Sequence, residues 1–320
     1  MNRILVTGAT GFVGNAVLCQ LSLSSVGSLV AGLRKQTHGL PQGVEPIVVG
    51  DLLAGTDYSP VFKHDVDVLV HCAARVHIMD DHTTDPLAEF RKVNVAGTLN
   101  LAKQAAKAGV KRFVFISSIK VNGEATDGVP FTADDKAMMS DPYGVSKYEA
   151  EQGLLKVSQE TGMEVVIIRP PLIYGPSVKA NFQKMMQWMK QGVPLPLGAV
   201  YNKRSLVALD NLVDFIVLCT HHPKAANEIF LISDGEDVST TELLRKVAKA
   251  MGKKAHLLPV PVGLMMFVAK LVGKEDVANR LFGSLQVDSS KARKLLGWKP
   301  VIGMDEQLRK TVKGCSILDG

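Results

Sequence analysis

The sequence predicts an α/β protein built on a doubly wound parallel sheet, with a smaller α/β domain toward the C-terminal end. Short apolar segments without polar alternation, typical of strands covered on both faces, alternate with helical segments through the first half. Beyond about Ile168 this rhythm becomes irregular. We therefore expect one domain over residues 1–168 and a second over residues 169–320. The two should be partly interleaved, with elements such as 205–222 returning to the first domain.

The bulk composition is that of an ordinary globular protein. The chain has 320 residues, of which 46% are hydrophobic and 21% charged, enough for one large core or two ordinary ones. Its formal net charge of +6 favours anionic partners, and residues 242–314 hold fifteen Lys and Arg against six Asp and Glu. The sequence contains no run of five basic residues, no zinc-spaced Cys and His set and no basic, aromatic-rich sheet pattern. These observations argue against a nucleic-acid partner and against a metal site.

The cysteines and the apolar segments favour a soluble, cytoplasmic protein. The cysteines are far apart and form no Cys-x-x-Cys pair, so we expect free thiols that serve as packing residues: Cys19, Cys72, Cys219 and Cys315. The N-terminus lacks the layout of a signal peptide, and no apolar run reaches the ~20 residues that span a bilayer. The apolar stretch 257–272 is interrupted by prolines and by a lysine. We expect it to form a short strand and a buried helix rather than a contact with a membrane surface.

A glycine turn follows the first predicted strand. Residues 4–7 form a short apolar run, and a helix is expected over residues 12–23. Between them, Gly8 permits a tight turn, Gly11 lets the backbone approach a pyrophosphate, and Gly14 lets the helix pack on the strand. The spacing is Gly-x-x-Gly-x-x-Gly rather than the commoner Gly-x-Gly-x-x-Gly. Strand, turn and helix N-terminus together predict a phosphate site of the Rossmann type.

Two cations, Arg34 and Lys35, follow the second strand, which is expected over residues 28–33. They lie about twenty residues beyond Gly14, where an NAD-binding unit usually places a carboxylate for the ribose 2′-hydroxyl. The planar guanidinium of Arg34 can instead bind a 2′-phosphate. The sequence therefore favours NADP(H) as cofactor, with NAD(H) as the alternative.

Later strands bring small and polar residues to the same edge of the sheet. Strands are expected over residues 45–49, 66–71 and 112–117, and a long helix over 86–108. In a doubly wound sheet, ligands bind beyond the carboxyl ends of the strands. We interpret His71, at one such end, as a hydrogen-bonded structural residue rather than a base or metal ligand.

The residues expected to carry chemistry are Tyr143 and Lys147, which are four apart and therefore share one face of a helix. Asp141 is a favourable N-cap and Pro142 suits a first turn, so the helix should begin there and run to about Thr161. An ordinary tyrosine titrates near pH ~10. A neighbouring cation favours the phenolate and can bring this value toward the range of a general acid or base.

In these features the chain resembles the extended short-chain dehydrogenase/reductases, in the branch of nucleotide-sugar epimerases, dehydratases and reductases. The resemblance covers nearly the whole length. It rests on seven motifs in order: the turn with Gly8, Gly11 and Gly14, Gly50-Asp51-Leu52, His71-Cys72-Ala73-Ala74, Asn94, Ser117-Ser118 followed by Val121-Asn122-Gly123, Tyr143-x-x-x-Lys147, and Arg169-Pro170-Pro171-Leu172-Ile173-Tyr174-Gly175-Pro176.

The resemblance implies a catalytic set and a cofactor site. Tyr143 would be the general acid/base, Lys147 would bind the nicotinamide ribose and lower the pKa of Tyr143, and Ser118 would hydrogen-bond the reacting oxygen. Asp51 and Leu52 would flank adenine, and Asn94 would support the central helix. The expected cofactor contacts are Gly8, Gly11, Phe12, Val13, Gly14, Arg34, Lys35, Asp51, Leu52, Ala73, Ala74, Arg75, Asn94, Ser117, Tyr143, Lys147 and Pro170.

The resemblance also implies that the second domain binds a nucleotide-diphosphate sugar, with UDP as the leading expectation. Asn181 resembles the family's amide contact to the substrate pyrophosphate, and Arg204 resembles its diphosphate ligand. Arg280 is a third candidate, and Ser118 is expected to contact the sugar. The alternative for each arginine is a surface salt bridge.

The type of reaction stays open between two alternatives. Dehydratases of this branch usually carry Asp-Glu after the catalytic Ser or Thr, whereas this chain has Ile119-Lys120 there, which argues against dehydration. Net reduction of a UDP-4-keto-6-deoxy-N-acetylhexosamine is the preferred interpretation, because Arg34 indicates an exchangeable NADPH. The alternative is 4-epimerisation of UDP-glucose or UDP-N-acetylglucosamine.

Two further expectations concern the whole protein. A non-catalytic NADP-binding sensor or scaffold is disfavoured, because Ser118, Tyr143 and Lys147 are all present. The family commonly dimerises, through the helices expected to open near Pro86 and Pro142, so a homodimer would fit the resemblance.

Overall fold

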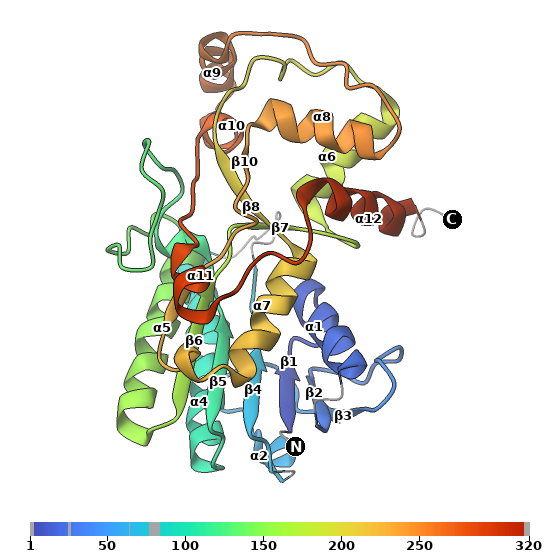
Figure 1. Ribbon diagram of the computed structural model, residues 1–320. Helices are drawn as coiled ribbons and strands as arrows, with labels where there is room; N and C mark the ends of the chain where they lie inside the picture. The colour runs from blue at the N-terminus through green and yellow to red at the C-terminus, as the bar shows by residue number, and fades with distance from the viewer. Residues whose placement is uncertain (1–2, 25–26, 64, 77–83, 317–320) are drawn as a thin grey trace.

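The computed structural model describes residues 3–24, 27–63, 65–76 and 84–316, except the side chains of residues 180, 181, 276, 315 and 316. Within these residues the larger sheet has seven parallel strands, in the order β3-β2-β1-β4-β5-β6-β9. They are β1 (Ile4–Thr7), β2 (Leu29–Leu33), β3 (Val44–Val48), β4 (Val68–His71), β5 (Arg112–Ile116), β6 (Glu164–Arg169) and β9 (Ile229–Leu231). The order reverses between β1 and β4, which confirms the predicted doubly wound fold (Figure 1).

Helices cover both faces of this sheet, α1 and α7 on one and α2, α4 and α5 on the other. Their bounds are α1 (Phe12–Leu23), α2 (Ser59–Phe62), α4 (Thr98–Lys107), α5 (Pro142–Thr161) and α7 (Leu209–His221). Successive residues of a strand point to opposite faces, so Leu5 belongs to one buried core and Val6 to the other. A strand covered on both faces needs apolar residues throughout, which explains the continuous apolar runs in the sequence.

α1 and α5 occupy the ranges predicted from the sequence, whereas the helix predicted over residues 86–108 is divided. α3 (Pro86–Phe90) leads into a π-helical segment, η1 (Arg91–Gly97), before α4 begins. η1 packs closely on the loop after β3, because a Cβ at Gly97 would lie 2.8 Å from Cγ of Leu52. Segments of π-helix are rare and occur frequently at functional sites, and this one carries Asn94.

A smaller sheet lies above the carboxyl ends of the large one (Figure 1). Among the described residues it has three strands, β7 (Leu172–Tyr174), β8 (Arg204–Ala208) and β10 (Asp237–Val238), in the order β10-β8-β7. The later helices are α6 (Ala180–Gln191), α8 (Thr240–Ala250), α9 (Val262–Leu271), α10 (Glu275–Phe282), α11 (Ser290–Leu296) and α12 (Met304–Ser316). The chain passes from β8 directly into α7, which packs on the large sheet, and then adds β9 to that sheet's edge.

The prediction of a buried helix within residues 257–272 is wrong. The first part makes a β-bridge between Leu257 and Leu195 instead of a strand, and α9, which the structure describes completely, contains no buried residue. Only one side of α9 packs on the small sheet's core, through Val262 and Met265. The prediction failed because apolar composition does not show where a helix lies. α9 lies at one end of the molecule, where protein covers only one of its sides. Within the described part of the chain, no helix is long and apolar enough to cross a bilayer.

The cysteines differ in burial. Cys219 is buried and Cys72 is half-buried, as packing residues should be, whereas Cys19 is exposed on α1, so the packing prediction is wrong there. All three are free thiols, as predicted. The side chain of Cys315 lies outside the described residues.

Candidate active site

The glycine turn after β1 forms a cradle that leaves no room for side chains. Gly8 has a φ of +69°, which L residues rarely adopt, and a Cβ on it would lie 2.6 Å from the backbone nitrogen of Ala73. Gly14 is buried against the carbonyl of Gly8. Gly11 is the N-cap of α1 and makes no side-chain cap, so the first backbone N–H groups of the helix can bind a phosphate. The pyrophosphate of a dinucleotide fits this cradle.

Arg34 and Asp51 lie together at the carboxyl edge of the large sheet. Both side chains are mostly exposed, and Nε of Arg34 is 3.9 Å from Oδ1 of Asp51. Lys35 is also exposed. Arg34 can donate to a 2′-phosphate, and Asp51 can accept from a 2′-hydroxyl. Other expected contacts at this edge are half-buried: Phe12, Val13, Leu52, Ala73, Ala74 and Arg75.

Asn94 joins the segment after β4 to α5. Its Oδ1 accepts from the backbone N–H of Arg75 at 2.8 Å, and its Nδ2 donates to the carbonyl of Arg75 at 3.0 Å. Nδ2 also donates to Oγ of Ser146 at 3.0 Å. Asn94 is buried, and it therefore holds the end of β4 against the helix that carries Tyr143 and Lys147.

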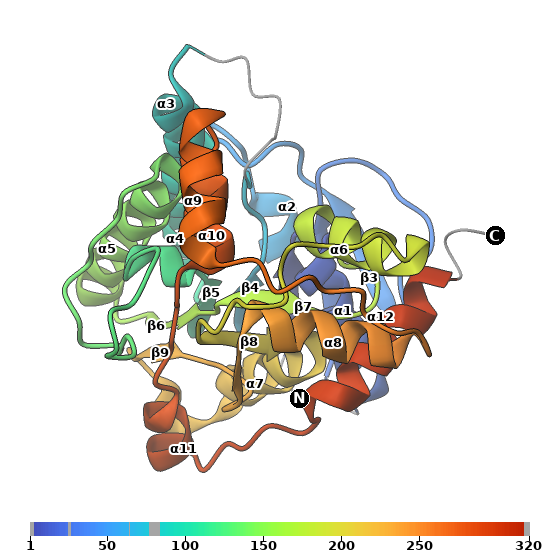
Figure 2. The same ribbon diagram turned by 90° about the horizontal axis from the view of Figure 1, so that it is seen from above.

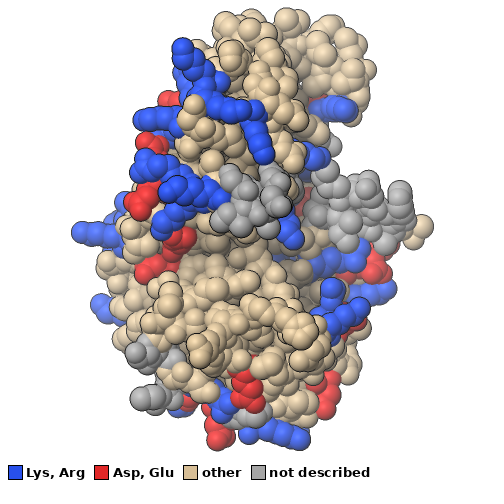
Figure 3. Space-filling view, turned by 90° about the vertical axis from the view of Figure 1, so that its right-hand side faces the viewer, with Lys and Arg blue, Asp and Glu red and all other residues tan. Residues whose placement is uncertain are grey.

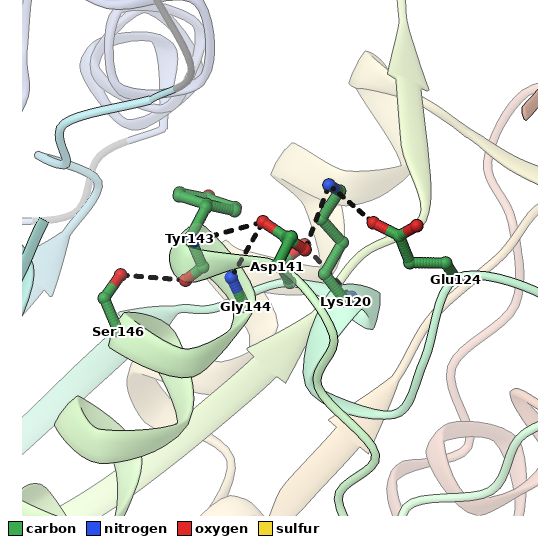
Figure 4. Close-up of polar contacts among 7 residues, drawn as sticks. Lys120, Glu124, Asp141, Tyr143, Gly144 and Ser146 are labelled. Atoms are coloured by element: carbon green, nitrogen blue, oxygen red, sulfur yellow. Dashed lines mark hydrogen bonds and ion pairs between the residues drawn. The ribbon is translucent and has the colours of Figure 1, made fainter. Parts of the chain in front are cut away.

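Asp141 fixes the start of α5. Its Oδ1 accepts from the backbone N–H groups of Tyr143 at 3.0 Å and Gly144 at 3.2 Å, which confirms the predicted N-cap. Its Oδ2 pairs with Nζ of Lys120 at 3.1 Å, and Nζ also lies 3.3 Å from Oε1 of Glu124. Figure 4 shows Lys120 held between these two carboxylates, beside the first turn of the helix.

The turn that carries Ser118 packs directly on this helix start. Ser118 is the N-cap of η2 (Ile119–Val121), and its Oγ accepts from the backbone N–H of Lys120 at 3.3 Å. A Cβ at Gly144 would lie 2.8 Å from the carbonyl oxygen of Lys120, so glycine is required for the contact. The buried Pro170 supports the turn from β6, because its carbonyl accepts from Ile119 at 3.0 Å. Ser118 and Tyr143 are thus carried by two elements in contact.

Lys147 lies one turn further along α5 and is buried. Its Nζ donates to the carbonyl of Ile116 at 2.8 Å and lies 4.4 Å from the ring centroid of Phe115. Burial lowers the pKa of Lys147 to about 8, although the carboxylate of Glu151 acts to raise it. Lys147 is therefore mainly cationic at neutral pH.

The protein's own groups raise the pKa of Tyr143. Burial disfavours the phenolate, and the carboxylate of Asp141 disfavours it further. In the protein alone the pKa of Tyr143 is therefore raised, and the expectation that Lys147 lowers it stays a prediction. The ring of Tyr143 packs edge-on against Phe90, with centroids 5.9 Å apart. Tyr143 is thus a neutral phenol that can donate a proton.

A buried ion pair behind these residues was not predicted from the sequence. Arg169 donates to Glu151 twice, from Nε to Oε1 at 3.0 Å and from Nη2 to Oε2 at 2.6 Å. Ser117, expected among the cofactor contacts, donates its hydroxyl to Oε1 of Glu151 at 2.5 Å, and Arg169 also donates to Asn122 at 3.0 Å. The sequence did indicate that Glu151 lies near the site, because it is four residues after Lys147 and therefore on the same helix face.

His71 has the structural role that we predicted. Its Nδ1 lies 2.6 Å from Oγ1 of Thr7, and its Nε2 lies 3.0 Å from Oγ1 of Thr98. Burial lowers the pKa of His71 to about 3, so the ring is neutral across the physiological range.

The residues expected at the substrate diphosphate are partly assembled. Nη1 of Arg204 donates to the carbonyls of Arg280 at 2.7 Å and Gly283 at 3.1 Å, and burial lowers the pKa of Arg204. Arg280 is exposed on α10. Arg204 therefore links β8 to the backbone at the end of α10. The side chain of Asn181 lies outside the described residues.

A glycine cradle at the carboxyl edge of a doubly wound sheet, with a tyrosine and a buried lysine one helical turn apart beside it, defines the class of extended short-chain dehydrogenase/reductases. The chain belongs to the NAD dependent epimerase/dehydratase family, which matches residues 4–233. It is therefore an enzyme of the nucleotide-sugar epimerase/dehydratase type that depends on a nicotinamide dinucleotide.

Several known proteins are similar to this chain. UDP-glucose 4-epimerase of Vibrio cholerae is 50% identical over 315 residues, which cover 97% of this chain and 94% of the relative. N-acetyl-alpha-D-glucosaminyl-diphospho-ditrans,octacis-undecaprenol 4-epimerase of Escherichia coli O157:H7 is 28% identical and covers 86% and 82%, respectively. The crystal structure of UDP-glucose 4-epimerase from Thermotoga maritima has the same fold, with a TM-score of 0.79 at 23% identity over 99% of this chain and 100% of that one.

Proposed function

We propose that the protein is a UDP-sugar 4-epimerase that acts on UDP-glucose or on UDP-N-acetylglucosamine. The observation that carries this proposal is the 50% identity to the Vibrio cholerae UDP-glucose 4-epimerase over almost the full length of both chains. It supports the alternative in the sequence analysis better than the preferred 4-keto reduction. Arg34 favoured reduction because it can bind the 2′-phosphate of NADPH, but the carboxylate of Asp51 beside it can bind a 2′-hydroxyl equally well.

The surroundings of Ser118 support a reaction without dehydration. The position where dehydratases of the family carry an acidic residue is held by Lys120, whose ammonium is occupied by Asp141 and Glu124. Ile119 and Lys120 do not supply the acidic pair with which dehydratases of the family expel the hydroxyl group from C6. Epimerisation at C4 needs no such group.

In this proposal the chain's own residues place the sugar and move one proton. A bound nicotinamide dinucleotide supplies reversible hydride removal at C4, and the turn with Gly8 would hold its pyrophosphate. Tyr143 takes the proton of the 4-hydroxyl as a phenolate and returns it to the 4-keto oxygen as a phenol. Ser118 donates a hydrogen bond to the same oxygen. Lys147 would bind the nicotinamide ribose, and its positive charge would oppose the effect of burial on the pKa of Tyr143.

The second part of the chain would bind the nucleotide diphosphate. Arg204 and Arg280 would provide positive charge for the two phosphates, and Asn181 would provide an amide. The contact of Arg204 with the backbone carbonyl of Arg280 supports this assignment, because it places the Arg204 guanidinium beside the segment that carries Arg280.

An activity assay distinguishes the epimerase, the reductase and the non-catalytic protein. Purified protein is incubated with UDP-glucose or UDP-N-acetylglucosamine without added cofactor, and we expect the corresponding galacto epimer to form. If the protein ignores these sugars, oxidises NADPH one-for-one with a UDP-4-keto-6-deoxy-N-acetylhexosamine and transfers deuterium from labelled NADPH to C4, it is a reductase. A protein that binds the dinucleotide and converts neither substrate would be a sensor or scaffold.

A further inference from the structure

Apart from Lys270, α9 is apolar around its circumference, although the protein covers only one side of it. Val262 and Met265 face the core of the small sheet. The opposite side consists of Leu264, Phe267, Val268 and Leu271, which are 56%, 62%, 49% and 71% exposed. Spacings of three and four residues place these four side chains on one face, which we call the outer face of α9. A helix that is apolar all round is normally buried in a large core or in lipid.

The neighbouring helix also exposes apolar side chains. α9 and α10 lie side by side at one end of the molecule, as Figures 1 and 2 both show. On α10, Val277 is 53% exposed and Leu281 is 38% exposed. Exposed apolar side chains gathered on two adjacent helices in this way usually mark an interaction site.

Basic residues flank this apolar surface. Lys270 on α9, Lys274 in the turn to α10 and Arg280 on α10 are all exposed. Over residues 253–281 the sequence has five Lys and Arg against two Asp and Glu, in a chain of net charge +6. Figure 3, which shows another side of the molecule, has Lys and Arg gathered on its upper half, below a top that carries few charged atoms. Long basic side chains can keep an apolar face in contact with lipid while their charges reach the headgroups.

We infer that the outer face of α9, with its flanking lysines, docks on the surface of an anionic lipid bilayer. No helix in the described residues can cross a bilayer, so the contact is an interfacial one, with α9 lying in the plane of the headgroups. Anionic lipid supplies both of the chemistries that the surface requires, an apolar layer for Phe267 and Leu271 and negative charge for Lys270 and Lys274.

A second copy of the chain fits this surface less well. The two helices have 10 and 8 residues and are about 15 Å and 12 Å long, so their exposed apolar faces together cover on the order of 400 Å², whereas a stable dimer buries about 800 Å² per partner. A symmetric contact would also join two surfaces that carry the same excess of positive charge. Like charges placed together in this way oppose association.

The test is sedimentation of the full-length protein with vesicles. One set of vesicles contains phosphatidylcholine alone, and the other contains phosphatidylcholine with phosphatidylglycerol. We expect the protein to sediment with the anionic vesicles and to be released as salt is raised. The double variant Phe267→Glu, Leu271→Glu should bind at least about tenfold more weakly, since burial of one such side chain contributes more than a tenfold change in affinity.

The matched control is Leu23→Glu, Val301→Glu, which places the same charges on two residues that are 84% and 60% exposed elsewhere. It should bind vesicles as the wild type does. Because all four side chains are exposed, the variants should keep their thermal unfolding midpoints, which are measured in parallel. Equal binding of both double variants would overturn the proposal. So would a concentration-dependent dimer, seen by light scattering, that is lost in Phe267→Glu, Leu271→Glu while neither protein sediments with vesicles.

Discussion

Tyr143 is the residue on which the proposed proton transfer depends. Tyr143→Phe removes the hydroxyl and leaves the ring in place against Phe90. We expect kcat to fall by ~10²–10⁴-fold, the usual contribution of a general acid or base, while the affinity for the dinucleotide changes only a few-fold. Tyr148→Phe, on the same helix, is the control and should keep its activity. A Tyr143→Phe enzyme with more than about a tenth of the wild-type rate would contradict the assignment.

Arg34 and Asp51 together should decide which dinucleotide binds. Arg34→Asp places a second carboxylate where the guanidinium stood, so it should repel a 2′-phosphate and favour a ribose hydroxyl. We expect the preference to move toward NAD(H), measured by calorimetry with both cofactors. Lys35→Asp makes the same change of charge one residue away and should have the smaller effect. If Arg34→Asp weakens both cofactors equally, Arg34 does not contact the 2′-position.

At the scale of secondary-structure elements, the site depends on the contact between the start of α5 and η2. Gly144→Ala would place a Cβ 2.8 Å from the carbonyl of Lys120 and push the two elements apart. Because Tyr143 and Ser118 sit on different sides of this contact, a shift of about 1 Å could lower kcat on the order of 10²-fold. The measurement is kcat together with the thermal unfolding midpoint. Val145→Ala, in the same turn, is the control, and a fully active Gly144→Ala enzyme would show that the spacing is unimportant.

At the scale of the whole molecule, His71 should make the stability of the fold depend on pH. Its pKa is about 3 in the folded state and near 6.5 when unfolded, so the unfolded chain binds the extra proton between these values. Stability is therefore lost as pH falls below 6.5. By linkage the free energy of unfolding should drop by about 2 kcal/mol between about pH 7 and pH 5 from this residue.

Urea denaturation of His71→Gln tests this prediction. The variant cannot take up a proton at this position, so the difference between its stabilities at the two pH values should be smaller than in the wild type by about 2 kcal/mol. His38→Gln changes an exposed histidine and should leave the difference as it is. An unchanged pH dependence in His71→Gln would show that other groups control acid sensitivity.

Interactions between residues close in the chain could be predicted from the sequence. The glycine turn, the N-cap at Asp141 and the four-residue spacing of Tyr143 and Lys147 each involve a few neighbouring residues, and the structure has them as predicted. The alternation of apolar strands with helices likewise determined the doubly wound sheet, since both faces of such strands must be buried. The choice between reduction and epimerisation did not follow from these local patterns.

Features that depend on burial or on contacts between distant residues were determined only by the tertiary structure. The pairing of Glu151 with Arg169 joins two elements, and the raised pKa of Tyr143 follows from its removal from water. The outer face of α9 is exposed although its apolar sequence predicts burial. The helix lies at one end of the molecule, where the protein covers only one of its sides. The sequence shows which side chains are apolar, but only the packed fold determines which of these side chains are buried.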